Sequence, residues 1–449
     1  MLKELMKPEI TELIENRRWH ELKGVFASWP PPEIADLLLD IEYQDRAVLF
    51  RLLPRDLAAD VFSYLEHEDR DVLLRDLNDQ ETKRLLADMS PDDRTDLFEE
   101  LPAKVTRRLL NLLNPDDLIE ARQLLGYPEE SVGRKMTPDF VAVRPDWSIA
   151  RALEHIRQFG RDSETIYRIY VTEKDGRLLD DIVLKKVILA SADSKISELM
   201  DHNVASLSAF DDQEEAVRMM ERYDLFAIPV VDSQGMLVGI VTHDDVFDIS
   251  EEEATEDFHK ISGMNPVEQT YLSASVWKMW IKRFPWLLAL LLANFITAGV
   301  ITHYESVVQS VVILAAFIPL LIGTAGNSGT QSATLIIRSL AIDEVGIRDW
   351  LRVLRKELAV GLMLGIVLGA ITYFRGLFEG DSGIGVAVVI SMTMLVLLLW
   401  ANIIGGLLPL ILARFNLDPA VISSPFIATV IDVTGIFIYF NIAIWILGL

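Results

Sequence analysis

Five long apolar segments towards the C-terminal end constrain the fold of this chain more than any other feature of its sequence. Each segment is long enough to cross about 30 Å of hydrocarbon as an α-helix, which rises about 1.5 Å per residue. The sequence therefore predicts an all-α membrane domain of five transmembrane helices in residues 281–449. We place the segments at residues 285–302, 311–336, 358–374, 384–413 and 420–447.

Acidic residues are concentrated in the part of the chain that precedes these segments. Residues 1–270 contain 58 Asp and Glu against 32 Lys and Arg, whereas residues 271–449 contain nine and ten. An acidic surface repels the phosphates of nucleic acids, so we expect no nucleic-acid partner. The chain has no cysteine, which excludes disulfides and thiolate metal sites and leaves oxygen or imidazole ligands for any metal.

Basic residues in the connections predict the orientation in the lipid bilayer, because cytoplasmic loops are enriched in Lys and Arg. The basic connections precede the first segment, join the second to the third and join the fourth to the fifth. They contain Lys278, Lys282, Arg283, Arg338, Arg348, Arg352, Arg355, Lys356 and Arg414. The opposite loops contain only Arg375. Residues 1–20 lack the apolar stretch of a signal peptide, so we expect a cytoplasmic N-terminus and an external C-terminus.

The fifth segment carries an aspartate, Asp432, in the run ATVIDVTGIFI. It lies about 12 residues into the segment, or about 18 Å along a helix, and so close to the middle of the bilayer. A carboxylate at that depth costs at least about 2.5–3.5 kcal/mol unless it contacts water, a cation or a partner. Two interpretations remain: a protonated or hydrogen-bonded aspartate at a helix contact, and an aspartate that faces an ion pathway.

Residues near Asp432 favour the ion pathway. Spacings of four, four and three place Ser424, Ala428, Asp432 and Gly435 on one stripe of the helix. Pro425 leaves a carbonyl of the preceding turn without its usual donor. Such carbonyls are tolerated at membrane depth where they face protein or a wet cavity. We therefore expect this stripe to line a pore.

The second segment is also unusually polar. Its stretch PLLIGTAGNSGTQSATLII, residues 319–337, contains three glycines together with Asn327 and Gln331. Small residues allow close helix packing, but packing does not account for the two amide side chains. The stretch has no lysine and so does not match a nucleotide-binding P-loop. We expect it to line the pore together with the fifth segment.

Residues 1–130 form a series of short amphipathic patterns. WPPPEIADLLLD, SPDDRTDLFEEL and NPDDLIEARQLL are three of them, with apolar residues at intervals of three and four and proline in the first turn. Helices this short bury little apolar surface alone. They are therefore expected to stack into an acidic superhelical array of hairpins.

Residues 131–250 contain two copies of a strand–helix–strand–strand–helix pattern. In the second copy, the run FAIPVVDSQGMLVGIVTHDDVFDI resembles the α/β regulatory domains of the cystathionine-β-synthase (CBS) type, which occur as tandem pairs. In that family a Thr-x-x-Asp after the last strand commonly holds the ribose of an adenine nucleotide such as ATP, and Thr242 with Asp245 matches it. The first copy has Leu184–Val187 instead, so the resemblance implies one nucleotide site at most.

The second copy and the residues after it are rich in carboxylates. Each has an ordinary explanation: Asp212 with Glu215 fits a helix capping box, and Asp245 with Asp248 fits a solvated helix face. As a group that faces further acids on the helical array, they repel one another unless cations bridge them. Such oxygen ligands suit Mg²⁺, which keeps most of its waters. The acidic run SEEEATEDFHK, residues 250–260, leads into a connecting helix expected over residues 251–280. This run is either a cation-sensing lever or a soluble linker.

The acidic array, the CBS pair, the connecting helix and the motifs GNSGTQSATLIIR and IDVTG together resemble the MgtE family of bacterial magnesium channels. The resemblance implies a homodimer in the bacterial cell membrane, whose pore runs between the second and fifth segments. Asp432 would bind hydrated Mg²⁺ there, near Asn327, Ala428 and Ser424. Some relatives have asparagine at the position of Ser424. Regulatory Mg²⁺ ions would hold the pore shut. The matching positions are Asp60, Asp92, Asp212, Glu214, Asp224, Asp245 and Asp248, with Glu253, Glu256 and Asp257 on the connecting ("plug") helix.

Two other classes of function remain open from the sequence. In one, the soluble part is a sensor of divalent cations or nucleotides and the apolar segments only anchor it, although an anchor does not need Asp432, Asn327 or Gln331. In the other, Asp432 carries protons in a proton-coupled exporter, whose transport depends on a pH gradient. No catalytic constellation of an enzyme is recognisable.

Overall fold

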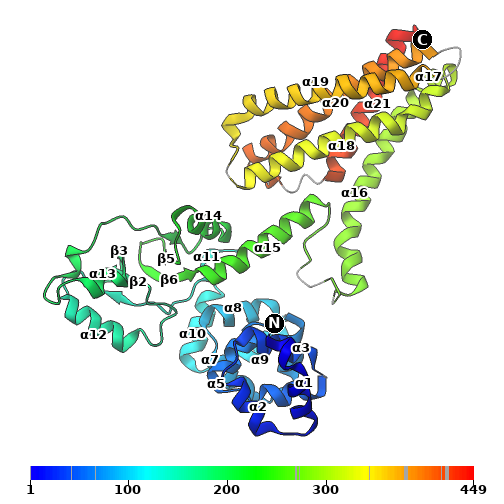
Figure 1. The fold of residues 1–449 in the computed structure, drawn as a ribbon. Coiled ribbons are helices and arrows are strands. Elements are labelled where there is room, and N and C mark those ends of the chain that lie inside the picture. The colour runs from blue at the N-terminus through cyan, green and yellow to red at the C-terminus, as the bar shows by residue number, and fades with distance from the viewer. Residues whose placement is uncertain are drawn as a thin grey trace. The chain divides into compact units, whose positions relative to one another are not determined.

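The structure is a computed structural model, which describes residues 2–41, 43–65, 67–267, 271–272, 274–342, 344–378, 383–415, 417–419 and 424–449. The chain divides into two compact units (Figure 1). We call residues 1–252 the soluble unit and residues 253–449 the membrane unit.

The first half of the soluble unit is a helical array. Proline opens three of its helices, at Pro31, Pro91 and Pro115, because the missing N–H is not needed in a first turn. Alternate helices pack together, for example α3 on α5 and α5 on α7, so the predicted stacking of short helices is confirmed. The helices are α1 (Leu2–Glu15), α2 (Trp19–Phe26), α3 (Pro31–Asp40), α4 (Tyr43–Phe50), α5 (Arg55–Ser63), α6 (His67–Asp76), α7 (Asp79–Asp88), α8 (Pro91–Glu100), α9 (Ala103–Leu110) and α10 (Pro115–Leu124).

The second half of the soluble unit has the duplicated α/β order that the sequence predicts. The first copy contains α11 (Val132–Lys135), β1 (Ala142–Val143), α12 (Ile149–Phe159), β2 (Arg168–Thr172), β3 (Leu178–Val183) and α13 (Leu184–Leu189), followed by the 3₁₀ helix η1 (Ile196–Glu198). The second contains β4 (Leu207–Ser208), α14 (Gln213–Tyr223), β5 (Ala227–Val231), β6 (Leu237–Thr242) and α15 (His243–Ile261). In each sheet the first strand is parallel to the second, and the second is antiparallel to the third.

The two CBS copies meet at the turns of their hairpins. The Leu178 N–H donates to the carbonyl of Gly235, and the Leu237 N–H donates to that of Gly176, both at 3.1 Å. Gly176 and Gly235 have φ angles of +96° and +79°, which glycine adopts without strain. The repeat seen in the sequence is therefore a paired repeat in space.

The connecting helix is continuous with the last helix of the CBS pair. The sequence predicts it over residues 251–280, but α15 begins at His243 and ends at Ile261. Gly263, with φ of +74°, follows the helix, and the Met264 N–H donates to the His259 carbonyl at 3.1 Å. A glycine in the left-handed conformation is a common helix stop. This local signal explains why the helix ends earlier than predicted.

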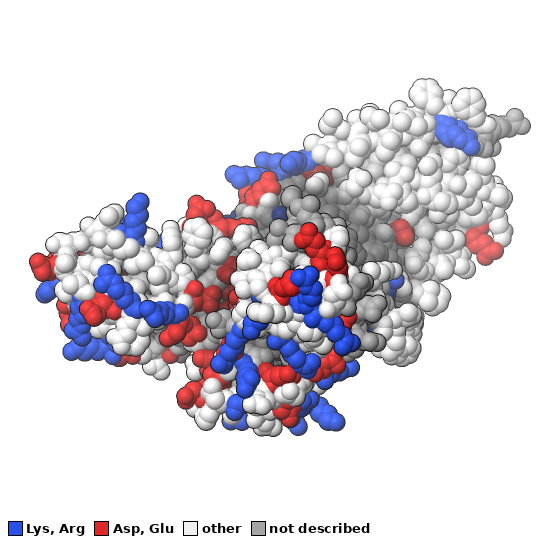
Figure 2. All heavy atoms as spheres, turned by 60° about the horizontal axis from the view of Figure 1, so that its bottom comes forward, with Lys and Arg blue, Asp and Glu red and all other residues white. Residues whose placement is uncertain are grey.

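The membrane unit is all-α. Within its described residues, five helices are long and apolar enough to cross a membrane, which agrees with the five predicted segments. They are α16 (Val276–His303), α18 (Ile313–Ala341), α19 (Trp350–Gly376), α20 (Gly383–Arg414) and α21 (Ser424–Leu447), with the short helices α17 (Glu305–Ser310) and η2 (Ile347–Asp349) between them. On the face drawn in Figure 2, charged side chains crowd the soluble unit and are few on the membrane unit.

Glycines let α18 approach its neighbours closely. A Cβ atom added at Gly405 on α20 would overlap the carbonyl oxygen of Gly329 on α18. A Cβ added at Gly329 would overlap Ile431 on α21. Backbone-to-backbone contact of this kind is how small residues hold membrane helices together. We call the Gly329–Gly405 contact the glycine seam.

Candidate functional site

Asp432 lies where α21 contacts α18. A Cβ atom added at Gly326 on α18 would lie 3.7 Å from Ala428 Cβ and 4.0 Å from Asp432 Oδ1. One turn along α18, the Thr330 hydroxyl donates to the Ser424 carbonyl at 3.4 Å. The two motifs that the sequence singles out therefore lie side by side.

The carboxylate of Asp432 is half-buried. It makes no hydrogen bond and no ion pair with any other described residue. The nearby hydroxyl of Thr434, by contrast, accepts from Trp400 Nε1 at 2.9 Å and donates to the Val430 carbonyl at 2.8 Å. A charged carboxylate in a membrane helix that lacks a protein partner requires water or a cation.

The other predicted pore residues have different exposures. Asn327 and Gln331 are exposed on α18, whereas Ser424 and Ala428 are half-buried on α21. All four belong to the two helices that meet at Asp432. Their contact with an ion stays a prediction.

Gly435 departs from the predicted stripe. It is buried, and a Cβ atom added there would lie 2.8 Å from Ile322 Cδ1 and 3.3 Å from Leu397 Cδ2. The expectation that it lines the pore was therefore wrong. The face of α21 that is partly open at Asp432 is covered by α18 and α20 one turn further along.

A buried amide that the sequence reading missed fixes the orientation of α18. Ser328 Oγ donates to Asn402 Oδ1 on α20 at 2.6 Å, and Ser332 Oγ donates to the Asn402 carbonyl at 3.4 Å. These three side chains are buried. Because Ser328 follows Asn327, the bond keeps Asn327 on the outer face of α18. The isolated asparagine in an apolar run was the available signal.

Acids of α8 and α15 come together with one from the first CBS copy. Burial, together with the charge of Asp93, raises the pKa of Asp92 to about 7. Burial and the charge of Asp92 raise the pKa of Asp245 well above its ordinary value. Burial, with Asp92 and Asp244 nearby, also raises the pKa of Glu164 to about 7. We call Asp92, Asp93, Glu164, Asp244 and Asp245 the acidic cluster.

Asp92 and Asp245 of this cluster were predicted from the sequence, whereas Glu164 was not. Glu164 lies between α12 and β2, and its N–H donates to the Asp139 carbonyl at 2.8 Å. No motif surrounds it, so only the tertiary structure brings it near α8. Asp96 was missed although it follows Asp92 by one helical turn, a spacing that places both on one face.

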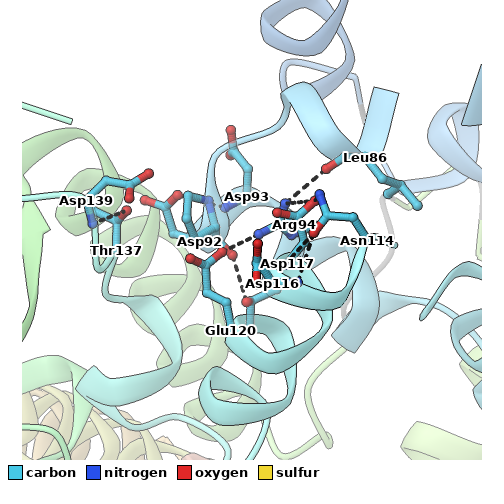
Figure 3. A network of polar contacts seen from close by, with 12 residues as sticks. Leu86, Asp92, Asp93, Arg94, Asn114, Asp116, Asp117, Glu120, Thr137 and Asp139 are labelled. Carbon is cyan, nitrogen blue, oxygen red and sulfur yellow. Dashed lines mark hydrogen bonds and ion pairs between the residues drawn. The ribbon is translucent and has the colours of Figure 1, made fainter. Parts of the chain in front are cut away.

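Figure 3 shows the support beneath the cluster. Arg94, which is only 3% exposed, donates from Nη1 to the Leu86 carbonyl at 3.0 Å and forms an ion pair with Glu120. Its fixed charge holds α8 against α10, while Asp92 points away from it towards the CBS segment that carries Thr137 and Asp139 (Figure 3). Asp93 instead accepts a hydrogen bond from Ser63 Oγ on α5 at 2.8 Å. The guanidinium thus positions α8.

Four predicted regulatory residues lie on other helices. Asp60 is exposed on α5. Asp212 caps α14 by accepting the Glu214 N–H at 2.9 Å, and Glu214 pairs with Arg218 at 2.6 Å. Asp224 follows α14 with φ of +50°. Asp212 and Glu214 therefore have structural roles at the start of α14, and binding of Mg²⁺ by these four residues stays a prediction.

The plug-helix acids belong to the membrane unit. Glu253 is half-buried, and Glu256 pairs with Lys260 at 2.5 Å. Lys260 also lies 2.9 Å from Asp418, in the connection between α20 and α21. Burial and the charge of Asp418 raise the pKa of Asp257. Within the membrane unit, Lys260 therefore joins this end of α15 to the connection between α20 and α21.

The side chains of the predicted nucleotide motif form hydrogen bonds with one another. The Thr242 hydroxyl lies 2.7 Å from Asp245 Oδ2 and 2.5 Å from Asp244 Oδ1, so its single proton bonds one of these two carboxylates at a time. A cavity of about 250 Å³ lies elsewhere in the CBS pair. Its lining includes Arg168, Asp181, Asn203, Tyr223 and Pro229. Motif and cavity therefore do not coincide.

A site at which protein side chains coordinate a metal ion directly is absent from the described part of the chain. Nowhere in that part do three acidic or histidine side chains lie close enough to hold an ion. A hydrated Mg²⁺ does not need such a site, because carboxylates contact it through its waters.

The raised pKa values predict how pH affects the soluble unit without Mg²⁺. Folded-state values near 7 for Asp92 and Glu164 exceed the unfolded values of about 4. The folded state therefore binds protons as pH falls, and this stabilisation is lost as pH rises through about 7. In chelator, hydrogen exchange of α8, corrected for intrinsic rates, should be faster at pH 8 than at pH 6. Equal protection at both pH values would contradict the prediction.

Comparison with known proteins identifies the family of this chain. Family models match as follows: MgtE, a divalent cation transporter, over residues 318–442, the MgtE intracellular N domain over residues 29–130, and the CBS domain over residues 130–193 and 196–252. The magnesium transporter MgtE of Thermus thermophilus is 41% identical over 324 residues, which cover 72% of each chain. The chain belongs to the MgtE family. The MgtE of Enterococcus faecalis is 37% identical over 325 residues, 72% of this chain and 71% of that one.

Solved structures of an MgtE channel and of a magnesium transporter resemble the soluble unit. The cytosolic domain of the Mg²⁺ channel MgtE in complex with ATP matches with a TM-score of 0.52 and 34% identity, over 53% of this chain and 98% of that one. The soluble part of a magnesium transporter matches with a TM-score of 0.53 and 28% identity, over 56% and 99%. The helical array and the CBS pair are thus the fold of an MgtE cytosolic domain.

Proposed function

We propose that this MgtE-family protein admits Mg²⁺ to the cell down its electrochemical gradient, through a pore beside Asp432. The Asp432 carboxylate carries the proposal: it is half-buried in a membrane helix, next to Gly326, without a partner among the described residues. The relatives named magnesium transporter MgtE support the same substrate. The sequence has no recognisable ATPase motif to drive uphill transport.

A pore between two copies of the chain fits the charge of the ion. One Asp432 carries one negative charge, whereas two across a symmetry axis match one divalent cation. Mg²⁺ gives up its waters reluctantly, so the carboxylates would contact the hydrated ion. We therefore propose a homodimer in the bacterial cell membrane, with the N-terminus cytoplasmic and the C-terminus outside, as the basic connections favour.

Intracellular Mg²⁺ is proposed to close this pore. The acidic cluster and the acids of α15 repel one another unless cations neutralise them. Ions that bind only the closed arrangement stabilise it by about 2.7 kcal/mol per site at 100 times the dissociation constant. Several such sites make the response to Mg²⁺ steep and self-limiting.

A nucleotide is proposed as a further ligand of the CBS pair. The related cytosolic domain was solved with ATP. The Thr242 hydroxyl and the Asp245 carboxylate already form a hydrogen bond with each other. We therefore propose that the nucleotide binds in the cavity that Arg168 and Tyr223 line.

Liposomes that contain the purified protein and a Mg²⁺-sensitive dye test the transport function. Flux should follow the Mg²⁺ gradient and the membrane voltage, and should persist when a protonophore collapses the pH gradient. Empty liposomes are the control. Absence of flux would favour the anchored sensor, and loss of flux with the protonophore would favour the proton-coupled exporter.

A further inference from the structure

Helix α20 packs against both of the helices that meet at Asp432, α18 and α21. Two polar side chains in the middle of α20, Trp400 and Asn402, each form a hydrogen bond with one of these helices. Trp400 Nε1 donates to the Thr434 hydroxyl on α21 at 2.9 Å. Asn402 Oδ1 accepts from the Ser328 hydroxyl on α18 at 2.6 Å. We call these two hydrogen bonds the α20 bracket.

The bond between Trp400 and Thr434 fixes the rotation of α21 about its own axis. Thr434 follows Asp432 by two residues, which is about 200° around an α-helix of about 3.6 residues per turn. Because Thr434 is held on α20, Asp432 faces away from α20. It lies instead beside Gly326 on α18, where an added Cβ atom would be 4.0 Å from its Oδ1. The direction of the Asp432 carboxylate is therefore set by a bond on the opposite side of α21.

The bond between Asn402 and Ser328 fixes α18 in the same manner. Ser328 follows Asn327 directly in the chain, so the bond also sets the direction of that amide. One turn further along α18, the Ser332 hydroxyl donates to the Asn402 carbonyl at 3.4 Å. Asn402 and both serines are buried, and a buried polar group that loses its partner is costly. Two successive turns of α18 are therefore held on α20.

Next to the bracket, the three helices touch one another at Gly329 on α18. A Cβ atom added there would lie 3.1 Å from the Ala401 carbonyl oxygen on α20 and would overlap Ile431 on α21. Ala401 stands between the two bracket residues of α20, and Ile431 directly precedes Asp432. Close packing therefore stops α18 and α21 from approaching further, while the bracket stops them from turning.

The position of the Asp432 carboxylate affects which divalent ion it accepts. Mg²⁺ gives up its waters reluctantly, whereas the larger Ca²⁺ takes more oxygen ligands in flexible geometries. A carboxylate held at a fixed position beside the pathway suits an ion that keeps its water shell. A carboxylate that can turn further into the pathway can replace those waters and coordinate Ca²⁺ directly.

We propose that Trp400 and Asn402 are positioning residues for ion selection, although α20 carries neither Asp432 nor the polar motif of α18. Through Thr434 and Ser328 they hold the Asp432 carboxylate where it suits hydrated Mg²⁺, and so disfavour Ca²⁺. The proposal rests on the proposed transport of Mg²⁺ and identifies the part of the chain that sets its specificity.

Thr434→Val and Ser328→Ala each remove one bond of the bracket with little change in side-chain size. Each variant should lower the ratio of Mg²⁺ flux to Ca²⁺ flux by about fivefold, the factor that loss of one ordinary hydrogen bond allows. The full chain is reconstituted into liposomes, and the two initial rates are measured in parallel samples of one preparation with a dye for each ion. The amount of folded protein then cancels from the ratio, so that a loss of stability alone does not change it.

Two further variants show whether the bond itself carries the effect. Thr372→Val is the matched control, because the Thr372 hydroxyl donates to the Gly369 carbonyl within α19 at 3.0 Å. Its flux ratio should equal that of the parent chain. Trp400→Phe removes the other end of the bond to α21. Combined with Thr434→Val, it should lower the ratio no further than Thr434→Val does alone, because both changes remove the same interaction.

The outcomes separate this proposal from the transport function on which it rests. A parent chain that admits no Mg²⁺ would refute both. If Mg²⁺ flux depends on Asp432 but Thr434→Val and Ser328→Ala keep the ratio of the parent chain, transport stands and the bracket has no role in selection. An equal fall of the ratio in Thr372→Val would also overturn the proposal, because any lost hydroxyl would then have the same effect.

Discussion

Replacing Asp432 by alanine is expected to reduce Mg²⁺ flux into liposomes by at least about 100-fold, which corresponds to about 2.7 kcal/mol in the barrier. The variant removes the acid that lies beside Gly326 and, in a dimer, both charges that attract the ion. A hydrated divalent cation then meets an apolar stretch of pore. The measurement is the initial rate of dye response at a fixed Mg²⁺ gradient.

Two further variants make this result specific. Asp432→Asn keeps the size of the side chain and removes its charge, so it should lose flux as well. Thr429→Val changes a residue on the same helix whose hydroxyl donates to the Pro425 carbonyl at 2.9 Å, and it should stay within about twofold of the parent chain. Equal flux through the parent chain and Asp432→Ala would refute the pore assignment.

The double variant Asp92→Asn/Asp245→Asn is expected to leave the pore open at high cytosolic Mg²⁺. These carboxylates belong to the acidic cluster, and each raises the cost of ionising its neighbours. As amides they no longer need a cation, so Mg²⁺ loses part of its preference for the closed arrangement. Flux at Mg²⁺ concentrations that close the parent channel should rise at least about tenfold.

A charge-matched control distinguishes gating from a general effect of net charge. Asp116→Asn/Asp146→Asn removes the same number of charges from exposed positions on the soluble unit. That pair should close at the same Mg²⁺ concentration as the parent chain. Unchanged closure of the Asp92/Asp245 variant would count against regulation at the acidic cluster.

Much of the fold could be predicted from the sequence because the signals are long or repeated. Each membrane helix is an apolar run longer than any soluble helix needs, and the CBS pattern occurs twice in order. Asp432 could be found because one acid in an apolar run is costly and therefore conspicuous. These features depend on a single segment of chain, read by itself.

The rest depends on contacts between distant segments. Glu164 and Lys135 carry no motif, and only the packing of α8, α11 and α15 brings them to the acids that they affect. Gly435 has the spacing of a pore residue, but Ile322 and Leu397 cover it. A helical stripe identifies one face of a helix, and the neighbouring helices decide which part of that face stays open.

The glycine seam limits how this sequence can change over time. At Gly329 and Gly405 even a single added methyl group overlaps backbone or a packed side chain. The two helices that carry these glycines, α18 and α20, are held together by the hydrogen bonds to Asn402. Drift at either position therefore requires a simultaneous shift of two helices, which independent point substitutions do not supply. We expect these two positions to be among the slowest to diverge in descendants of this chain.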